Sequence, residues 1–197
     1  MDELNEAYEK ADMLKALDLP LCKEQLDIIG HLEKESGKVH REDLNLYYYE
    51  KCYANYTKRI MNIRQAKVRG EVIVAKPLLM LAIFDGISAE IFQGNEIHLN
   101  EWLETRYVML MRQYVKGSQF DKPTDIANPF WHLQSDGFWH LYYQGESLTK
   151  GKTPSKAWLK EQVEYACFDE DLWSLLQNKE WRMKLRDYIV EHKLLGL

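Results

Sequence analysis

The stretch FWHLQSDGFWHLYY, residues 130–143, repeats the tetrapeptide Phe-Trp-His-Leu on either side of Gln-Ser-Asp-Gly. An Asp-Gly pair between aromatic runs is a strong hairpin signal, because both residues tolerate the positive φ of a tight two-residue turn. With Asp136 and Gly137 in the turn, both faces of the ribbon are largely apolar. A two-stranded hairpin is not stable alone in water, so we expect helices to pack on it.

Most of the remaining sequence has helical periodicity. Lys76-Pro77 begins a segment that is apolar nearly all round, which predicts a buried central helix. Asn100 is placed to cap the helix that follows it, and Thr153-Pro154 begins another that we expect to reach Ala166. Apolar residues recur at helical spacing over about 2–18, 21–35, 41–67, 100–114 and 179–194.

These patterns predict a mostly α fold, a multi-helix domain with one small antiparallel β-hairpin at about 130–143. We expect two parts, a helical N-terminal extension over residues 1–69 and the hairpin-containing domain over residues 70–197. A ribbon that is apolar on both faces could also form the seam of a dimer, so the oligomeric state stays open.

Composition excludes several classes of protein. Cys22, Cys52 and Cys167 lie far apart and form no C-x-x-C pair, which argues against a disulfide scaffold or a structural zinc site. The N-terminus is acidic, without a signal-peptide pattern, and no apolar run has the roughly 18–20 residues that a membrane span needs. We therefore expect a cytoplasmic protein without a membrane partner.

No catalytic pattern is found in the sequence. The six histidines form no H-E-x-x-H motif, and G-x-S-x-G, G-x-G-x-x-G and Walker motifs do not occur. Glu71 and Lys76 are an odd number of positions apart, so on a strand they would point to opposite faces. We expect no enzyme activity, no metal site and no cofactor.

Charge is distributed unevenly along the chain. The formal net charge is −5, which disfavours a protein that grips nucleic acid through bulk charge. From Lys51 to Lys76, however, there are seven Lys and Arg residues against Glu71 alone. Two interpretations stay open for this segment, a solvated helix face or a surface that contacts nucleic acid.

Two motifs about fifty residues apart resemble a known family. The first is Lys76-Pro-Leu-Leu-Met-Leu-Ala, and the second runs from Asn128-Pro-Phe-Trp-His-Leu through Asp136-Gly137 to Trp139. Over about residues 70–193 the chain resembles the sulfur-binding domain of phosphorothioation-dependent HNH restriction endonucleases. The resemblance implies a mostly helical domain with a small hairpin. It also implies recognition of DNA in which sulfur replaces one phosphate oxygen, in a shallow apolar pocket flanked by basic side chains.

The match to that family differs from position to position. Where the family has a histidine, a pocket tyrosine and a small residue, this chain has Ala75, Asn128 and His132. A basic residue of the family's later helical region is replaced near Tyr165, and we do not expect the family's nuclease domain in this sequence. The positions that agree are Lys76, Pro129, Phe130, Leu133, Asp136, Gly137 and Trp139.

Two hypotheses follow for function. In the first, the chain is a non-catalytic DNA-recognition protein that reads phosphorothioate DNA in a restriction or defence system. In the second, it is a protein–protein interaction module on the same scaffold, with DNA binding lost and the N-terminal helices as the partner surface. The first hypothesis predicts cations on one face bordering Pro129. Its predicted DNA-binding residues are Arg64, Arg69, Lys76, Asn128, Pro129 and His132.

Overall fold

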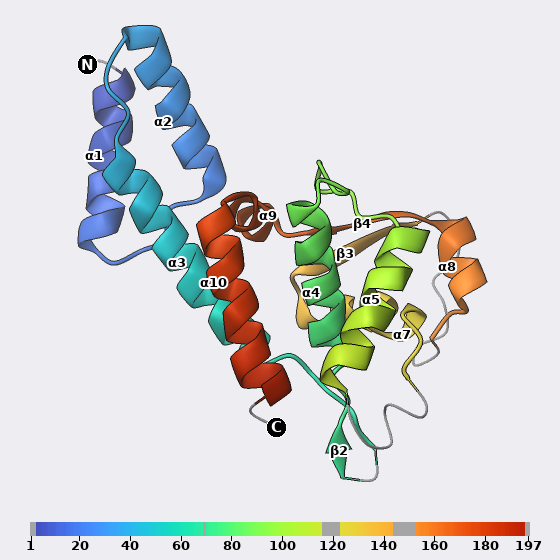
Figure 1. Ribbon diagram of the computed structural model, residues 1–197. Coiled ribbons are helices and arrows are strands. Elements are labelled where there is room, and N and C mark those ends of the chain that lie inside the picture. The colour runs from blue at the N-terminus through green and yellow to red at the C-terminus, as the bar shows by residue number, and fades with distance from the viewer. Residues whose placement is uncertain (1–2, 69, 116–122, 144–152, 196–197) are drawn as a thin grey trace.

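The computed structural model describes residues 3–68, 70–115, 123–143 and 153–195, and it confirms a mostly α fold (Figure 1). Two short antiparallel sheets accompany the helices, β1 (Lys67–Val68) with β2 (Glu71–Val72) and β3 (Trp139–Tyr143) with β4 (Val163–Phe168). The α-helices described are α1 (Glu3–Ala16), α2 (Lys23–Ser36), α3 (Glu42–Met61), α4 (Ala75–Ser88), α5 (Glu101–Tyr114), α7 (Ala127–His132), α8 (Lys156–Gln162), α9 (Glu170–Gln177) and α10 (Lys179–Ile189).

Helix α4 is the centre of the fold, as its all-round apolar sequence predicts. Eleven of its 14 residues are buried, and it contacts α5, α7, α9 and α10. The predicted cap of α5 is also confirmed, since the Asn100 side chain accepts a hydrogen bond from the Leu103 backbone N–H at 2.9 Å. In Figure 1, α4 and α5 lie side by side, and α1 and α2 project beyond the rest of the molecule.

The prediction of a hairpin at 130–143 is wrong. The first Phe-Trp-His belongs to α7, a 3₁₀ turn spans Leu133–Asp136, and only the second copy enters a strand. Phe130 and Leu133, three positions apart, are both fully buried, which favours a helix over a strand. Gly137 does adopt a positive φ of 80°, but it ends a helical turn and does not join two strands.

The true partner of β3 is β4, a segment that the sequence pattern assigned to a helix. Helix α8 ends at Gln162, and Trp139 pairs with Phe168 while Leu141 pairs with Ala166. Ala166 and Phe168 are buried on one face of β4, so the chain follows a two-residue period there. Because β3 and β4 are distant in the sequence, no local turn signal predicts that they pair.

The N-terminal helices join the rest of the molecule mainly through α3, and α2 also contacts α9. Helix α3 contacts α9 and α10, and Tyr49 and Tyr53 pack on Trp181 with ring centroids 6.2 and 5.5 Å apart. Buried side chains form one cluster that extends from Leu4 to Ile189. The boundary between residues 69 and 70 stays a prediction.

Candidate nucleic-acid interface

Asp136 is the anchor of the predicted site. Its carboxylate accepts a hydrogen bond from Lys76 Nζ at 2.6 Å and another from the Arg64 backbone N–H at 3.0 Å. The Lys76 and Asp136 side chains are only 11% and 4% exposed, so water screens this ion pair weakly. The pair joins the start of α4 to the turn that follows α7. The hydrogen bond from the Arg64 backbone N–H also holds the segment after α3 against this turn.

Arg59, in the last turns of α3, also contacts the turn that contains Asp136. Its guanidinium donates to Asp169 Oδ2 at 2.7 Å and to the Gly137 carbonyl at 2.6 Å. His140 Nε2 also contacts Asp169, at 2.6 Å from Oδ1. Burial disfavours ionisation of Asp169, but the hydrogen bonds from His140 and Arg59 outweigh it, and the pKa of this carboxyl lies below its ordinary value.

The structure brings four of the predicted residues together around one hollow. This hollow of about 340 Å³ is lined by Arg64, Lys76, Asn128 and His132. A second hollow, of about 380 Å³, adjoins it through Arg64 and is also lined by Lys58 and Arg59. We call these two hollows, with Lys58, Arg59, Arg64 and Lys76, the cationic face.

Of the other two predicted residues, the structure describes only Pro129, and it places this residue differently. Pro129 is buried in the first turn of α7, where its missing backbone N–H costs nothing, and it does not line either hollow. Arg69 lies outside the described residues. Alkyl groups of Ala66, Ile73 and Ala75 line the first hollow between the polar side chains.

His132 and Asn128 are held by a shared hydroxyl. Thr153 Oγ1 lies 2.8 Å from His132 Nε2 and 3.3 Å from Asn128 Nδ2, which donates to it. Burial, and then the positive charge of Lys76, lower the pKa of His132 below its ordinary value. The imidazole is therefore mainly neutral at neutral pH, and an anion in the hollow would favour its protonation.

Thr153 and Lys193 hold parts of the candidate site in place, and the sequence does not predict either role. Thr153 is 21 positions from His132, and no motif links them. Lys193 is buried and donates from Nζ to the Met61 carbonyl at 2.8 Å, which satisfies one of the last carbonyls of α3. Burial lowers the pKa of Lys193, and the nearby Asp136 carboxylate acts in the opposite direction.

Neither a metal-binding group of side chains nor a membrane-spanning helix occurs in the described part of the chain. Within residues 3–68, 70–115, 123–143 and 153–195, no three His, Cys, Asp or Glu side chains are grouped to hold a metal ion. No helix in these ranges has the length and apolar character required to cross a membrane.

Comparison with known proteins gives one family match. The model of the ScoMcrA-like DNA sulfur-binding domain matches residues 54–195, most of the chain. The comparison with curated proteins finds no match. The matched range begins within α3, so it contains the whole cationic face and leaves out α1 and α2. The chain therefore belongs to the ScoMcrA-like DNA sulfur-binding domain family.

Proposed function

We propose that this chain recognises phosphorothioate-modified duplex DNA through the cationic face. The observation that carries the proposal is the convergence of Arg64, Lys76, Asn128 and His132 on one hollow, although up to 68 positions separate them in sequence. Membership in a DNA sulfur-binding domain family supports the same ligand. We assign the chain a recognition role without bond cleavage, in a restriction or defence system.

The cations of this face have different parts in the proposed complex. The Arg64 side chain is exposed and has no carboxylate partner among the described residues, so its guanidinium can bind a phosphate through two parallel hydrogen bonds. Lys58 is also exposed and adds a second phosphate contact along the face. Lys76 already neutralises Asp136, so its main contribution is to fix the shape of the hollow.

The wall of the first hollow suits a sulfur atom. Sulfur is larger and more polarisable than oxygen, and it loses less on leaving water for contact with alkyl groups. Ala66, Ile73 and Ala75 offer such contacts beside the polar side chains. A phosphorothioate would place its sulfur on this wall and its non-bridging oxygen toward Arg64.

A titration of matched duplexes tests the proposal. Two duplexes of one sequence, with and without a single phosphorothioate, are titrated with the full chain at two salt concentrations. We expect tighter binding of the sulfur-containing duplex, and affinities that fall steeply with salt because phosphate contacts release counterions. Equal affinity for both duplexes would contradict sulfur recognition.

The second candidate function is a protein–protein interaction module with DNA binding lost. It is favoured by one feature of the cationic face, since Asp136 and Asp169 already neutralise Lys76 and Arg59. The net charge of −5 acts in the same direction. Absence of binding to either duplex at low salt would favour this function over the first.

A further inference from the structure

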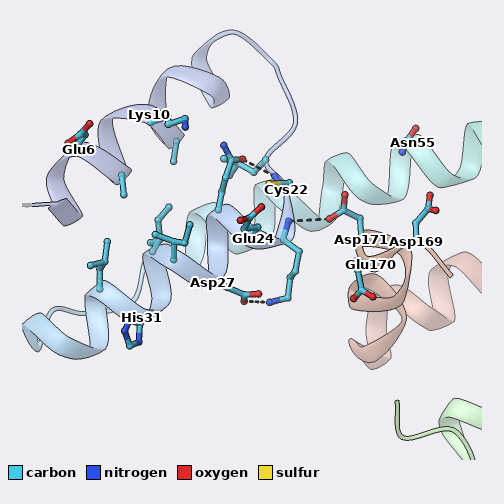
Figure 2. Close-up of a pocket in the computed structure, with 18 of the residues that line it drawn as sticks. Glu6, Lys10, Cys22, Glu24, Asp27, His31, Asn55, Asp169, Glu170 and Asp171 are labelled. Carbon is cyan, nitrogen blue, oxygen red and sulfur yellow. Dashed lines mark hydrogen bonds and ion pairs between the residues drawn. The ribbon is translucent and has the colours of Figure 1, made fainter. Parts of the chain in front are cut away.

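A large groove meets the cationic face at Asn55 and Arg59 and extends away from it. It has a volume of about 1110 Å³ and runs between α1 and α2 toward the start of α9 (Figure 2). Helices α1 and α2, which supply most of its lining, lie outside the range that matches the family, so the proposed DNA role does not account for that part of the groove. We call it the acidic groove, for the charges described below.

The acidic groove has apolar side chains between its charged ones. Ala7 from α1 and Leu32 from α2 are only partly buried against the core, and Ile28 from α2 is 50% exposed. An exposed isoleucine flanked by further apolar groups on a concave surface is typical of a site that a partner covers.

Carboxylates surround this apolar part. The residues that line the groove include seven carboxylates and three Lys or Arg side chains. Asp169 and Asp171, at the α9 end, already accept hydrogen bonds from Arg59 and from the Lys23 backbone N–H. Glu3, Glu6 and Glu24 have no ion-pair partner in the part of the chain that the structure describes. Figure 2 shows Glu6 on α1 and Glu24 on α2, with Asp169, Glu170 and Asp171 at the other end of the groove.

The charge and the apolar lining of the acidic groove indicate what kind of molecule it can bind. An excess of carboxylates repels the phosphates of nucleic acid, and the described residues contain no grouping that could hold a metal ion. Helices α1 and α2 have 14 residues each, so the walls are about 21 Å long. A helix of similar length, apolar on one face and basic on its flanks, matches the groove in length and charge.

We propose that the acidic groove docks a basic amphipathic helix of a partner protein, with the apolar face of that helix on Ile28 and its Lys or Arg side chains beside Glu3, Glu6 and Glu24. The same chain would then present DNA-binding cations and a protein-docking groove that meet at Asn55 and Arg59.

The probe is a synthetic 14-residue helical peptide with leucines on one face and lysines on its flanks. Its counterpart carries glutamates in place of the lysines and keeps the same leucines. Fluorescence anisotropy with the full chain measures both. We expect the lysine peptide to bind with an affinity that falls with salt, and the glutamate peptide not to bind. Absence of binding by the lysine peptide at low salt would overturn the proposal.

Variants separate docking in the groove from general attraction between opposite charges. Ile28→Asp and the triple variant Glu3→Gln/Glu6→Gln/Glu24→Gln should each weaken binding of the lysine peptide about tenfold or more. Ile28 is half exposed, so Ile28→Asp should fold, and its circular dichroism melting curve checks this. The matched control Glu9→Gln/Glu50→Gln/Glu191→Gln removes the same charge from exposed positions outside the groove and should bind as the wild type does.

Three further outcomes would contradict the proposal or identify a different occupant. Equal losses in the groove triple variant and its control would reduce the binding to general charge attraction and overturn the proposal. A wild-type dimer in sedimentation that Ile28→Asp dissolves would assign the groove to a second copy of this chain. Unchanged duplex binding by Ile28→Asp is expected, because Ile28 lines neither hollow of the cationic face. Loss of DNA affinity in this folded variant would overturn the proposal.

Discussion

At the cationic face, carboxylates of the fold already hold two of the four cations, whereas in the acidic groove Glu3, Glu6 and Glu24 have no ion-pair partner among the described residues. The ion pair of Lys76 with Asp136 is almost fully buried, but the N-terminal Arg41–Asp12 pair has side chains that are 30% and 51% exposed. Charge therefore has two uses in this molecule. Near the predicted DNA site much of it stabilises the fold, and in the N-terminal region most of it remains in contact with solvent.

The largest expected effect is the loss of the buried anchor. Asp136→Ala should lower the free energy of unfolding by about 3–5 kcal/mol, because it leaves the Lys76 ammonium buried without its partner. Urea denaturation measures the change. In Asp136→Ala/Lys76→Met the Lys76 ammonium is removed together with its partner, so much of the loss should be recovered. A cost below about 1 kcal/mol for Asp136→Ala would remove the contrast between the two regions.

The next effect concerns DNA binding by Arg64, which no carboxylate of the described residues holds. Arg64→Ala should weaken binding to the phosphorothioate duplex about tenfold and reduce the salt dependence by about one counterion. Lys179→Ala, an exposed cation outside both hollows, is the matched control and should bind as the wild type does. Equal losses in the two variants would indicate that only net charge matters.

A pH dependence should arise from His132. Its pKa in the free protein is lowered by burial and by Lys76, and a DNA phosphate in the hollow would raise it. The complex then binds more protons, so DNA affinity should rise several-fold as the pH falls through the pKa of the complex and level off below that of the free protein. His132→Gln should abolish this dependence in duplex titrations, whereas His140→Gln should retain it. A flat wild-type profile would place His132 away from the phosphates.

Without DNA, the same histidine has the opposite effect on stability. The folded chain holds the His132 pKa below its unfolded value, so its contribution is present above the ordinary histidine pKa. That contribution is lost as the pH falls through the folded value. His132→Gln should therefore lose less of its free energy of unfolding between neutral and mildly acidic pH than the wild type, as urea titrations would show.

The smallest effect belongs to the exposed pair. Asp12→Asn removes the charge of Asp12 and one of the two acceptors that Arg41 contacts at 2.8 and 3.1 Å, but Arg41 keeps its bond to Asp43. We expect a loss below about 1 kcal/mol in the free energy of unfolding, because solvent screens the pair. A loss as large as that of Asp136→Ala would show that exposure does not separate the two regions.

How far the sequence predicts this molecule depends on the range of each interaction. The buried helix after Lys76 and the cap at Asn100 follow from local patterns, and both are confirmed. The Asp136-Gly137 hairpin signal predicts a strand for the first Phe-Trp-His-Leu, and a short apolar run does not by itself distinguish helix from strand. Its helical state follows from the burial of Phe130 and Leu133 against distant segments.

The residues of the candidate site also differ in how far the sequence predicts them. Family resemblance selected Lys76, Asn128 and His132, and the basic segment selected Arg64; the structure places all four around one hollow. The partners that restrain them, Asp136 for Lys76 and Thr153 for His132, depend on tertiary contacts that no local pattern encodes. A charge count over the basic segment therefore overstates how many cations are free for DNA.

The most direct test of this division of charge is hydrogen exchange of the full chain with and without the phosphorothioate duplex. The account predicts slower amide exchange on DNA binding around residues 62–66 and 127–136, with α1 and α2 unchanged. Slower exchange confined to α1 and α2, with residues 62–66 and 127–136 unaffected, would contradict it.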